Sequence, residues 1–256
     1  MTQNIYDDAD FFAAYARLPR SAGGLDAAPE WETLRAMLPP LTGAHVIDLG
    51  CGYGWFCRWA RGAGAASVLG LDVSERMLAR ARSDTQDDAI TYRRADLERP
   101  DLPRGAFGLA YSSLALHYIE RLDGLVAAVH AALVPGGRFV FSVEHPMVTA
   151  PAHQGWSKDA DGRATWPVSR YLDEGPRVTN WLAPGVVKQH RSIAGYLDIA
   201  LRNGFRLDRL VEWAPGAADI AANPDWIADR ERPPFLLVAC TCIRPADAMA
   251  GSADAV

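Results

Sequence analysis

The sequence has little of what marks secreted, membrane or nucleic-acid-binding proteins. Its 256 residues include only four cysteines, at positions 51, 57, 240 and 242, and their spacing is not that of a zinc site. Acidic side chains (31) outnumber basic ones (26), so no excess of positive charge is available for phosphate contacts. No apolar run reaches the ~20 residues of a membrane span, and the polar start lacks a signal peptide. We therefore expect a cytoplasmic protein with buried free thiols and with no nucleic-acid, membrane or metal partner.

Apolar residues make up 49% of the chain, enough for a sizeable core. Strand and helix patterns alternate over residues 46–141, which is typical of a parallel sheet covered by helices on both faces. A chain of this length can form one large α/β domain with an elaboration.

A glycine-rich turn over residues 50–54 is the most informative local feature. A buried strand runs into Gly50, Gly52 and Gly54, and a helix is expected directly afterwards, over residues 55–61. Glycine permits positive φ and close approach of a ligand to the backbone, while the helix start presents free N–H groups. The dinucleotide fingerprint would require a third glycine where Trp55 stands. Asp48 before the turn would repel a pyrophosphate, so a cationic nucleotide-like ligand fits better.

Two further acids follow predicted strands. Asp72 comes after an apolar strand over residues 67–71, at the position where ribose hydroxyls are usually held. Asp96 comes just past a strand over residues 90–93 and could accept a hydrogen bond from the exocyclic amine of adenine.

These segments together resemble the class I S-adenosylmethionine-dependent methyltransferases, and within them the small bacterial enzymes that methylate metabolites and natural products. The resemblance covers roughly residues 7–242. It is carried by five segments in the expected order: VIDLGCGYG (46–54), LGLDVSERML (69–78), RADL (94–97), FGLAYSSLALHY (107–118) and LVPGGRFVFSVEHP (133–146).

This resemblance implies an α/β fold: a Rossmann-like, doubly wound sheet of seven strands in the order 3-2-1-4-5-7-6, with the last strand antiparallel. One domain would span residues 1–244, with an N-terminal lid and helix over 1–40, a substrate-cap insertion after the fifth strand over 145–190, and a disordered tail over 245–256. The cofactor would be S-adenosyl-L-methionine and the product S-adenosyl-L-homocysteine, with no metal. The implied cofactor-binding residues are Tyr15, Arg20, Asp48, Gly50, Gly52, Trp55, Asp72, Val73, Met77, Asp96, Leu97 and Ser112.

Candidate catalytic residues follow from the chemistry. Methyl transfer from a sulfonium needs in-line positioning and, for an acceptor that carries a proton, a base or a path to water. His117 follows the fourth strand and is the first candidate, as base or as orienting group; the alternative is that it caps or packs the next helix. Similar His-Tyr pairs contact the acceptor in some related enzymes, so Tyr118 is a substrate candidate. His145 follows the fifth strand and is the second catalytic candidate, unless it only fixes the exit of the chain.

The insertion is rich in aromatic residues, which suit a planar or apolar small molecule. Tyr171 and Trp181 are its substrate candidates, and the alternative is a small core that fastens the insertion to the domain. His190 is expected at the start of the next helix, where it either closes the pocket or is simply solvated.

The hypothesis from sequence is an enzyme, monomeric or homodimeric, that methylates O or N of a small aromatic or heteroaromatic metabolite. A protein methyltransferase whose insertion grips a peptide stays open, as does a module that binds the cofactor without catalysis. Trp55 and Asp48 disfavour a nicotinamide oxidoreductase.

Overall fold

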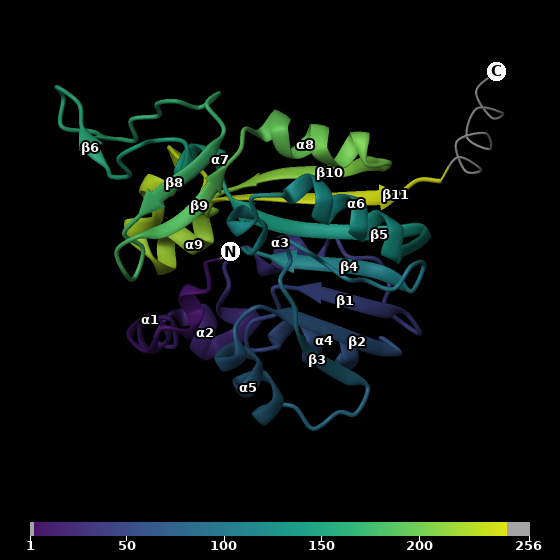
Figure 1. Cartoon of the computed structure of the whole chain (residues 1–256). Helices are drawn as coiled ribbons and strands as arrows, with labels where there is room; N and C mark the ends of the chain where they lie inside the picture. The colour runs from purple at the N-terminus through teal and green to yellow at the C-terminus, as the bar shows by residue number, and fades with distance from the viewer. Residues whose placement is uncertain (1–2, 245–256) are drawn as a thin grey trace, which may run out of the picture.

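A computed structural model describes residues 3–244 of the chain and centres on one mixed sheet (Figure 1). The strand order is β10-β11-β5-β4-β1-β2-β3, which confirms the predicted order. The strands are β1 (His45–Leu49), β2 (Ser67–Asp72), β3 (Ile90–Arg94), β4 (Phe107–Ser113), β5 (Leu133–Glu144), β10 (Phe205–Trp213) and β11 (Phe235–Cys242). As predicted, β11 runs antiparallel to both of its neighbours, β5 and β10, whereas β1 to β5 pair in parallel.

The central strands bury both of their faces, which explains their nearly continuous apolar runs. Along β1, Val46 packs into one hydrophobic cluster while its neighbour Ile47 packs into the other. Helices α6 (Leu122–Ala132) and α8 (Ile193–Arg202) contribute to the cluster of Ile47. The cluster of Val46 includes side chains of α3 (Trp31–Arg35), α4 (Trp55–Gly62) and α5 (Glu75–Ser83). All four cysteines are free and buried, as expected.

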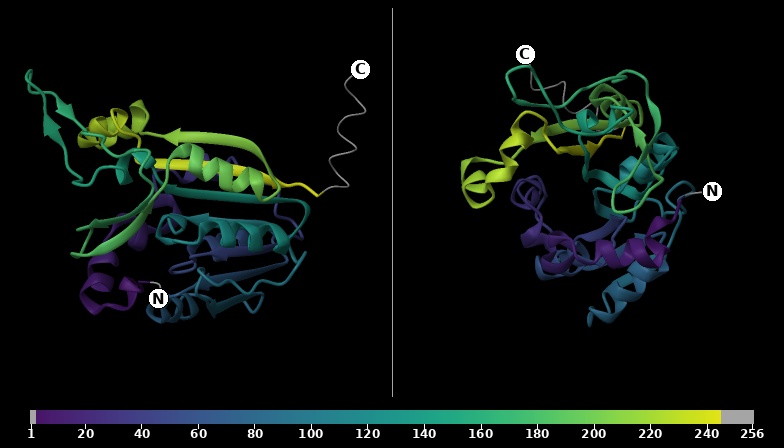
Figure 2. Two further views of the ribbon diagram at one scale, coloured as in Figure 1. Left: turned by 45° about the horizontal axis from the view of Figure 1, so that its top comes forward. Right: turned by 90° about the vertical axis from the view of Figure 1, so that its left-hand side faces the viewer.

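Most of the remaining elements gather beyond the ends of β1 and β4, which are the carboxyl ends of the parallel strands (Figure 1). Seen from that side, α1, α2, the hairpin of β8 and β9, and α9 form a ring (Figure 2). The bounds are η1 (Ile5–Asp7), α1 (Ala9–Tyr15), α2 (Pro19–Gly23), η2 (Gly24–Ala27), η3 (Leu116–Tyr118), α7 (Pro146–Thr149), β8 (Gly175–Thr179), β9 (Val186–His190) and α9 (Ala217–Ala222). In open α/β sheets ligands bind at this edge.

Two segments outside the sheet also contain regular structure. The insertion contains two antiparallel hairpins, β6 (Ser157–Lys158) with β7 (Ala164–Thr165) and β8 with β9. The segment between β10 and β11 contains α9 and the 3-10 helix η4 (Pro224–Arg230). Both are short elements with little periodicity to detect. The predicted disordered tail lies outside the described residues.

Within residues 3–244, no helix combines the length and the apolar character needed to cross a bilayer. The described residues also contain no group of three or more His, Cys, Asp or Glu side chains arranged as metal ligands.

Truncating a central core ring should destabilise the fold. Phe139 on β5 is fully buried, and its ring centroid lies 4.8 Å from that of Phe141 and 5.7 Å from that of Phe205. We expect Phe139→Ala to lower the free energy of unfolding by about 3–5 kcal/mol in urea denaturation. The control is Leu201→Ala, because Leu201 is 54% exposed. Equal losses in the two variants would contradict this packing.

Candidate functional site

The glycine turn between β1 and α4 adopts the conformation that its sequence suggests. Gly50, Gly52 and Gly54 have φ values of 80°, 52° and 72°, in the left-handed region that favours glycine. A Cβ atom at Gly50 would collide with Ala115, and one at Gly54 would collide with the ring of Tyr92. At Gly52 no atom lies within 4 Å of the Cβ position, and this residue lines a cavity. Bare backbone at Gly52 therefore faces open space, as a ligand-binding turn requires.

Asp72, at the end of β2, is oriented by the neighbouring backbone. Its Oδ2 accepts a hydrogen bond from Gly52 N at 2.9 Å and its Oδ1 accepts one from Ser74 N at 2.9 Å. Burial raises its pKa, and these backbone N–H groups oppose that rise. A carboxylate offers about four lone-pair sites. Acceptor capacity is therefore left over for a ribose diol at the cavity, which Asp72 lines.

Asp48 lies deeper, 2% exposed, and its Oδ2 accepts a hydrogen bond from Cys57 Sγ at 3.3 Å. Burial raises the pKa of Asp48 to about 7, with a smaller contribution from the charge of Asp72. An approaching cation would favour the ionised form of this carboxyl.

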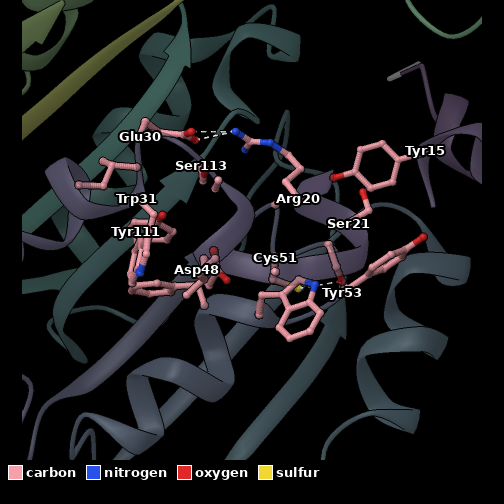
Figure 3. Close-up of a pocket in the computed structure, with 18 residues that line it drawn as sticks. Tyr15, Arg20, Ser21, Glu30, Trp31, Asp48, Cys51, Tyr53, Tyr111 and Ser113 are labelled. Atoms are coloured by element: carbon pink, nitrogen blue, oxygen red, sulfur yellow. Dashed lines mark hydrogen bonds and ion pairs between the residues drawn. The ribbon is translucent and has the colours of Figure 1, made fainter. Parts of the chain in front are cut away.

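Two neighbouring spaces lie at the carboxyl edge of the sheet. The larger is a cavity of about 810 Å³, near the upper end of the ~300–1,000 Å³ usual for ligand sites. The smaller is a recess of about 100 Å³ that reaches Asp48 (Figure 3). Both are lined by Tyr15, Arg20, Gly50, Gly52 and Ser113. Of the predicted cofactor residues, the cavity is also lined by Asp72, Val73, Met77 and Leu97, whereas Asp48 and Trp55 line the recess.

The N-terminal segment docks onto this edge through polar contacts. Asp7 Oδ1 accepts hydrogen bonds from Ser74 Oγ at 2.6 Å and from Arg76 N at 3.2 Å. Tyr15 and Arg20 line both spaces, but Arg20 already donates two hydrogen bonds to the carboxylate of Glu30, at 2.8 and 2.9 Å (Figure 3). A ligand carboxylate at Arg20 would therefore share a guanidinium that is already paired.

His117 lines the cavity and is 2% exposed. Burial lowers the pKa of His117 to about 4, so the ring is neutral at pH 7. Its Nδ1 lies 3.3 Å from the backbone N of Glu144 and accepts its hydrogen bond, which leaves the single proton on Nε2. This tautomer suits a hydrogen-bond donor that orients an acceptor better than it suits a base. Its neighbour Tyr118 also lines the cavity and accepts a hydrogen bond from Tyr6 Oη at 3.3 Å.

The expectation that His145 faces the same cavity is wrong. His145 is not among the cavity-lining residues and is fully buried. Its Nδ1 accepts a hydrogen bond from Met147 N at 3.1 Å, capping α7, and its Nε2 lies 2.9 Å from Glu212 Oε1. Both ring nitrogens are thus engaged in fixing the exit of the chain from β5, which is the structural alternative.

His190 and Tyr171 also lie away from the cavity lining. His190 ends β9 instead of starting the next helix, and its ring nitrogens contact Thr149 Oγ1 at 2.8 Å and Tyr171 O at 2.9 Å. The Tyr171 hydroxyl accepts a hydrogen bond from Ile193 N at 3.2 Å. These residues fasten the insertion to the domain. Trp181, in contrast, lines the cavity.

Two predicted cofactor residues do not line the cavity, whereas the next residue in the chain does so in each case. Ser112 is fully buried and donates a hydrogen bond to Leu49 O at 2.7 Å, whereas Ser113 lines the cavity. Asp96 is exposed and accepts a hydrogen bond from Glu98 N at 3.0 Å, while Leu97 beside it lines the cavity.

Sequence reasoning missed several cavity residues. Glu144, the last residue of β5, lines the cavity, and so do residues of α9 and η4. Glu144 could have been found by the rule that identified Asp48 and Asp72, an acid at a strand end. In residues 214–234, no sequence pattern predicted a helix that would line the cavity.

Comparison with known proteins agrees with this geometry. A family profile described as a methyltransferase domain matches residues 47–141. A solved protein of Mesorhizobium loti, described as an S-adenosylmethionine-dependent methyltransferase, is 56% identical, with a TM-score of 0.83 over 85% of this chain and 100% of that one. The chain belongs to the S-adenosylmethionine-dependent methyltransferases. A second solved protein, from Listeria monocytogenes and described as a putative methyltransferase of this kind, is 39% identical, with a TM-score of 0.76 over 84% of this chain and 98% of that one.

Curated relatives are more distant. An uncharacterised protein of Haemophilus influenzae is 31% identical over 247 residues, covering 92% of this chain and 95% of that protein. A malonyl-[acyl-carrier protein] O-methyltransferase of Pectobacterium atrosepticum is 32% identical over 164 residues. This second match covers 64% of this chain and 59% of the relative.

The methyltransferase uses S-adenosylmethionine, and the carboxyl edge of its sheet fits that group. When bound, the cofactor supplies an activated methyl group on a sulfonium. Gly52 offers bare backbone, Asp72 offers spare acceptor capacity for hydroxyl groups, and Asp48 offers a buried carboxyl that a nearby cation would ionise.

Asp72→Ala should weaken binding of S-adenosylhomocysteine at least tenfold, because hydrogen bonds to a charged group contribute about 1.5–3 kcal/mol each. Titration calorimetry measures the affinity. The control is Asp87→Ala, which removes a carboxylate whose ion pair, with Arg61, lies outside both spaces. Equal affinities of Asp72→Ala and the unmodified enzyme would remove Asp72 from the site.

The pKa of Asp48 also predicts a pH dependence of stability. The folded-state pKa of about 7 lies above the ~3.9 of an unfolded Asp, so between these values the folded protein keeps a proton that the unfolded chain has released. The free energy of unfolding should therefore fall as pH rises through this window, with no further loss above it. Urea denaturation at several pH values should show a smaller fall in Asp48→Asn. Identical pH profiles would contradict the assignment.

Proposed function

We propose that this methyltransferase transfers a methyl group to an oxygen or nitrogen atom of a small aromatic or heteroaromatic metabolite. The observation that carries the proposal is the aromatic lining of the cavity beyond the glycine turn. That lining comes from the N-terminal segment, η3, the insertion, η4 and β11: Tyr6, Tyr118, Trp181, Trp226 and Phe235. Flat faces with a few polar groups suit a planar acceptor.

Aromatic contacts between the insertion and the N-terminal segment are a second argument for a small acceptor. The ring centroid of Trp181 in the insertion lies 5.7 Å from that of Phe11 and 6.3 Å from that of Tyr15 in the N-terminal segment. Two segments far apart in the sequence therefore meet above the site and together act as lid and cap. Such enclosure excludes water and holds the acceptor in line, and positioning of this kind can account for ~7–11 kcal/mol of a reaction barrier.

The charge of the lining narrows the acceptor further. Acidic side chains along the cavity are Asp26, Asp72, Glu144 and Asp219, whereas Arg20 is the one Lys or Arg among the described lining residues. Arg20 is already paired with Glu30, and Glu144 with Lys188, so Asp26, Asp72 and Asp219 leave the lining with a net negative charge. A neutral or cationic acceptor is favoured over an anionic one.

His117 orients the acceptor in this proposal. Its Nε2 carries the proton at neutral pH and donates a hydrogen bond, while the adjacent Tyr118 supplies an aromatic surface.

The malonyl-[acyl-carrier protein] relatives raise a second candidate, O-methylation of an acid carried on a protein. A malonyl group ends in a carboxylate, which the acidic lining would repel. The match also covers only 59% of the first of those relatives, so its substrate cannot be transferred to this chain.

The test uses S-adenosylmethionine labelled on its methyl group. Purified enzyme is incubated with a panel of hydroxylated and N–H aromatic metabolites and, separately, with malonyl-acyl-carrier protein. We expect label in an extractable small aromatic product. Label only in malonyl-acyl-carrier protein, or only in a protein band when lysate is added, would contradict the proposal.

A further inference from the structure

The cavity wall contains an ion pair between Glu144 and a buried lysine. Glu144 Oε1, at the end of β5, lies 2.5 Å from Nζ of Lys188 on β9. The side chain of Lys188 is 3% exposed, and its Nζ lies 5.0 Å from the ring centroid of Trp181. The ammonium group of Lys188 is thus held in place by a carboxylate and by an aromatic face.

Only one oxygen of Glu144 is used by this pair. The other, Oε2, is buried and has no hydrogen-bond partner within residues 3–244. A buried carboxylate oxygen without a hydrogen-bond donor destabilises the folded protein, because it has lost its hydrogen bonds to water and has formed none in their place. The backbone N–H of Glu144 does not supply the missing hydrogen bond, since it already donates to His117 Nδ1.

The residues around Glu144 indicate which molecule would donate a hydrogen bond to its Oε2. Glu144 lines the cavity together with His117, Tyr118 and Trp181, the residues placed on the acceptor side of the site. Although burial alone would raise the pKa of Glu144, nearby His117 and Lys188 hold it below its usual value, so the residue stays a carboxylate. A carboxylate accepts hydrogen bonds and donates none. Its partner must therefore carry an O–H or N–H group.

We propose that Glu144 binds the reacting O–H or N–H group of the methyl acceptor, and thereby selects hydrogen-bond donors over carboxylates. The reacting group is either neutral or an ammonium group that gives one proton to Glu144 before its nitrogen attacks the methyl carbon. This inference rests on the proposed function and specifies the acceptor side of the same site. Lys188 is a positioning residue, because it orients the carboxylate without touching the acceptor.

The proton balance is consistent with this role. As the bond from the acceptor heteroatom to the methyl carbon forms, the bond from sulfur to that carbon breaks, and the heteroatom becomes far more acidic. Its proton then passes to Glu144 Oε2 and from there to water. Glu144 need not be a strong base, because the proton leaves a heteroatom that has already gained the methyl group.

The test measures binding of matched naphthalene probes to the full chain saturated with S-adenosylhomocysteine. The probes are 2-naphthol, 2-naphthylmethylamine, 2-naphthoate and 2-methoxynaphthalene, and ligand-observed NMR gives their dissociation constants. We expect the naphthol and the ammonium probe to bind about tenfold or more tightly than the naphthoate and the methyl ether. In Glu144→Gln the ammonium probe should lose about tenfold in affinity, whereas the methyl ether should be unaffected.

Controls separate this inference from the proposed function. Glu75→Gln alters an exposed carboxylate paired with Arg82 and should leave all four affinities unchanged. Failure of the unmodified protein to bind S-adenosylhomocysteine would count against the proposed function. Normal S-adenosylhomocysteine binding with no preference for donor probes, or with a preference for the ammonium probe that survives Glu144→Gln, would overturn the role of Glu144.

A second variant covers the case in which Glu144→Gln leaves Lys188 as an unpaired buried charge and prevents folding. Glu144→Gln combined with Lys188→Met removes the pair as a unit, which buried ion pairs tolerate better than loss of one partner. The double variant should bind S-adenosylhomocysteine normally and should have lost the preference for the ammonium probe. Retention of that preference would also overturn the proposal.

Discussion

The carboxylate of Asp72 is the interaction on which the site depends, because it joins the tips of two neighbouring strands. One oxygen holds the N–H of Gly52 in the glycine turn, and the other holds the N–H of Ser74 at the start of α5. Ser74 Oγ accepts from Met77 N, which caps that helix, and donates to Asp7 in the N-terminal segment. One chain of hydrogen bonds thus runs from the bare backbone of the turn to the segment that covers the cavity.

This arrangement divides the site into two parts with different origins. The residues expected to hold the cofactor lie at strand ends and in the glycine turn, where the register of the parallel sheet fixes them. The elements proposed to hold the acceptor are η3, the insertion and α9, which lie outside the sheet, and the N-terminal segment lines both spaces. A fold of this class therefore specifies the cofactor much more strongly than the acceptor. Glu144 lies where the two parts meet, since it ends a sheet strand and pairs with Lys188 of the insertion.

The same division explains what could be predicted from the sequence. The resemblance to the methyltransferase family predicted the sheet order. Strand patterns placed Asp48 and Asp72 at the carboxyl edge, where both line the site, because parallel strands bring their carboxyl ends to one edge. The position of a residue near such an edge did not predict which way its side chain points. Ser112 points into the core while Ser113 lines the cavity, because successive residues of a strand face opposite sides.

The histidines show the limit most clearly. His117 and His145 follow strands and His190 ends one, yet of these three only His117 lines the cavity. The other two contact polar side chains of the chain, Glu212 for His145 and Thr149 for His190, which lie 67 and 41 residues away in sequence. No local pattern contains such partners, so the choice between a catalytic and a structural histidine required the tertiary structure.

The most direct test of the account is a crystal structure of the enzyme with S-adenosylhomocysteine. The account predicts the ribose hydroxyls within hydrogen-bond distance of Asp72, the amino-acid part in the recess beside Asp48, and the sulfur facing the space between His117 and Glu144. Density for S-adenosylhomocysteine at any other place, or a ribose turned away from Asp72, would contradict it.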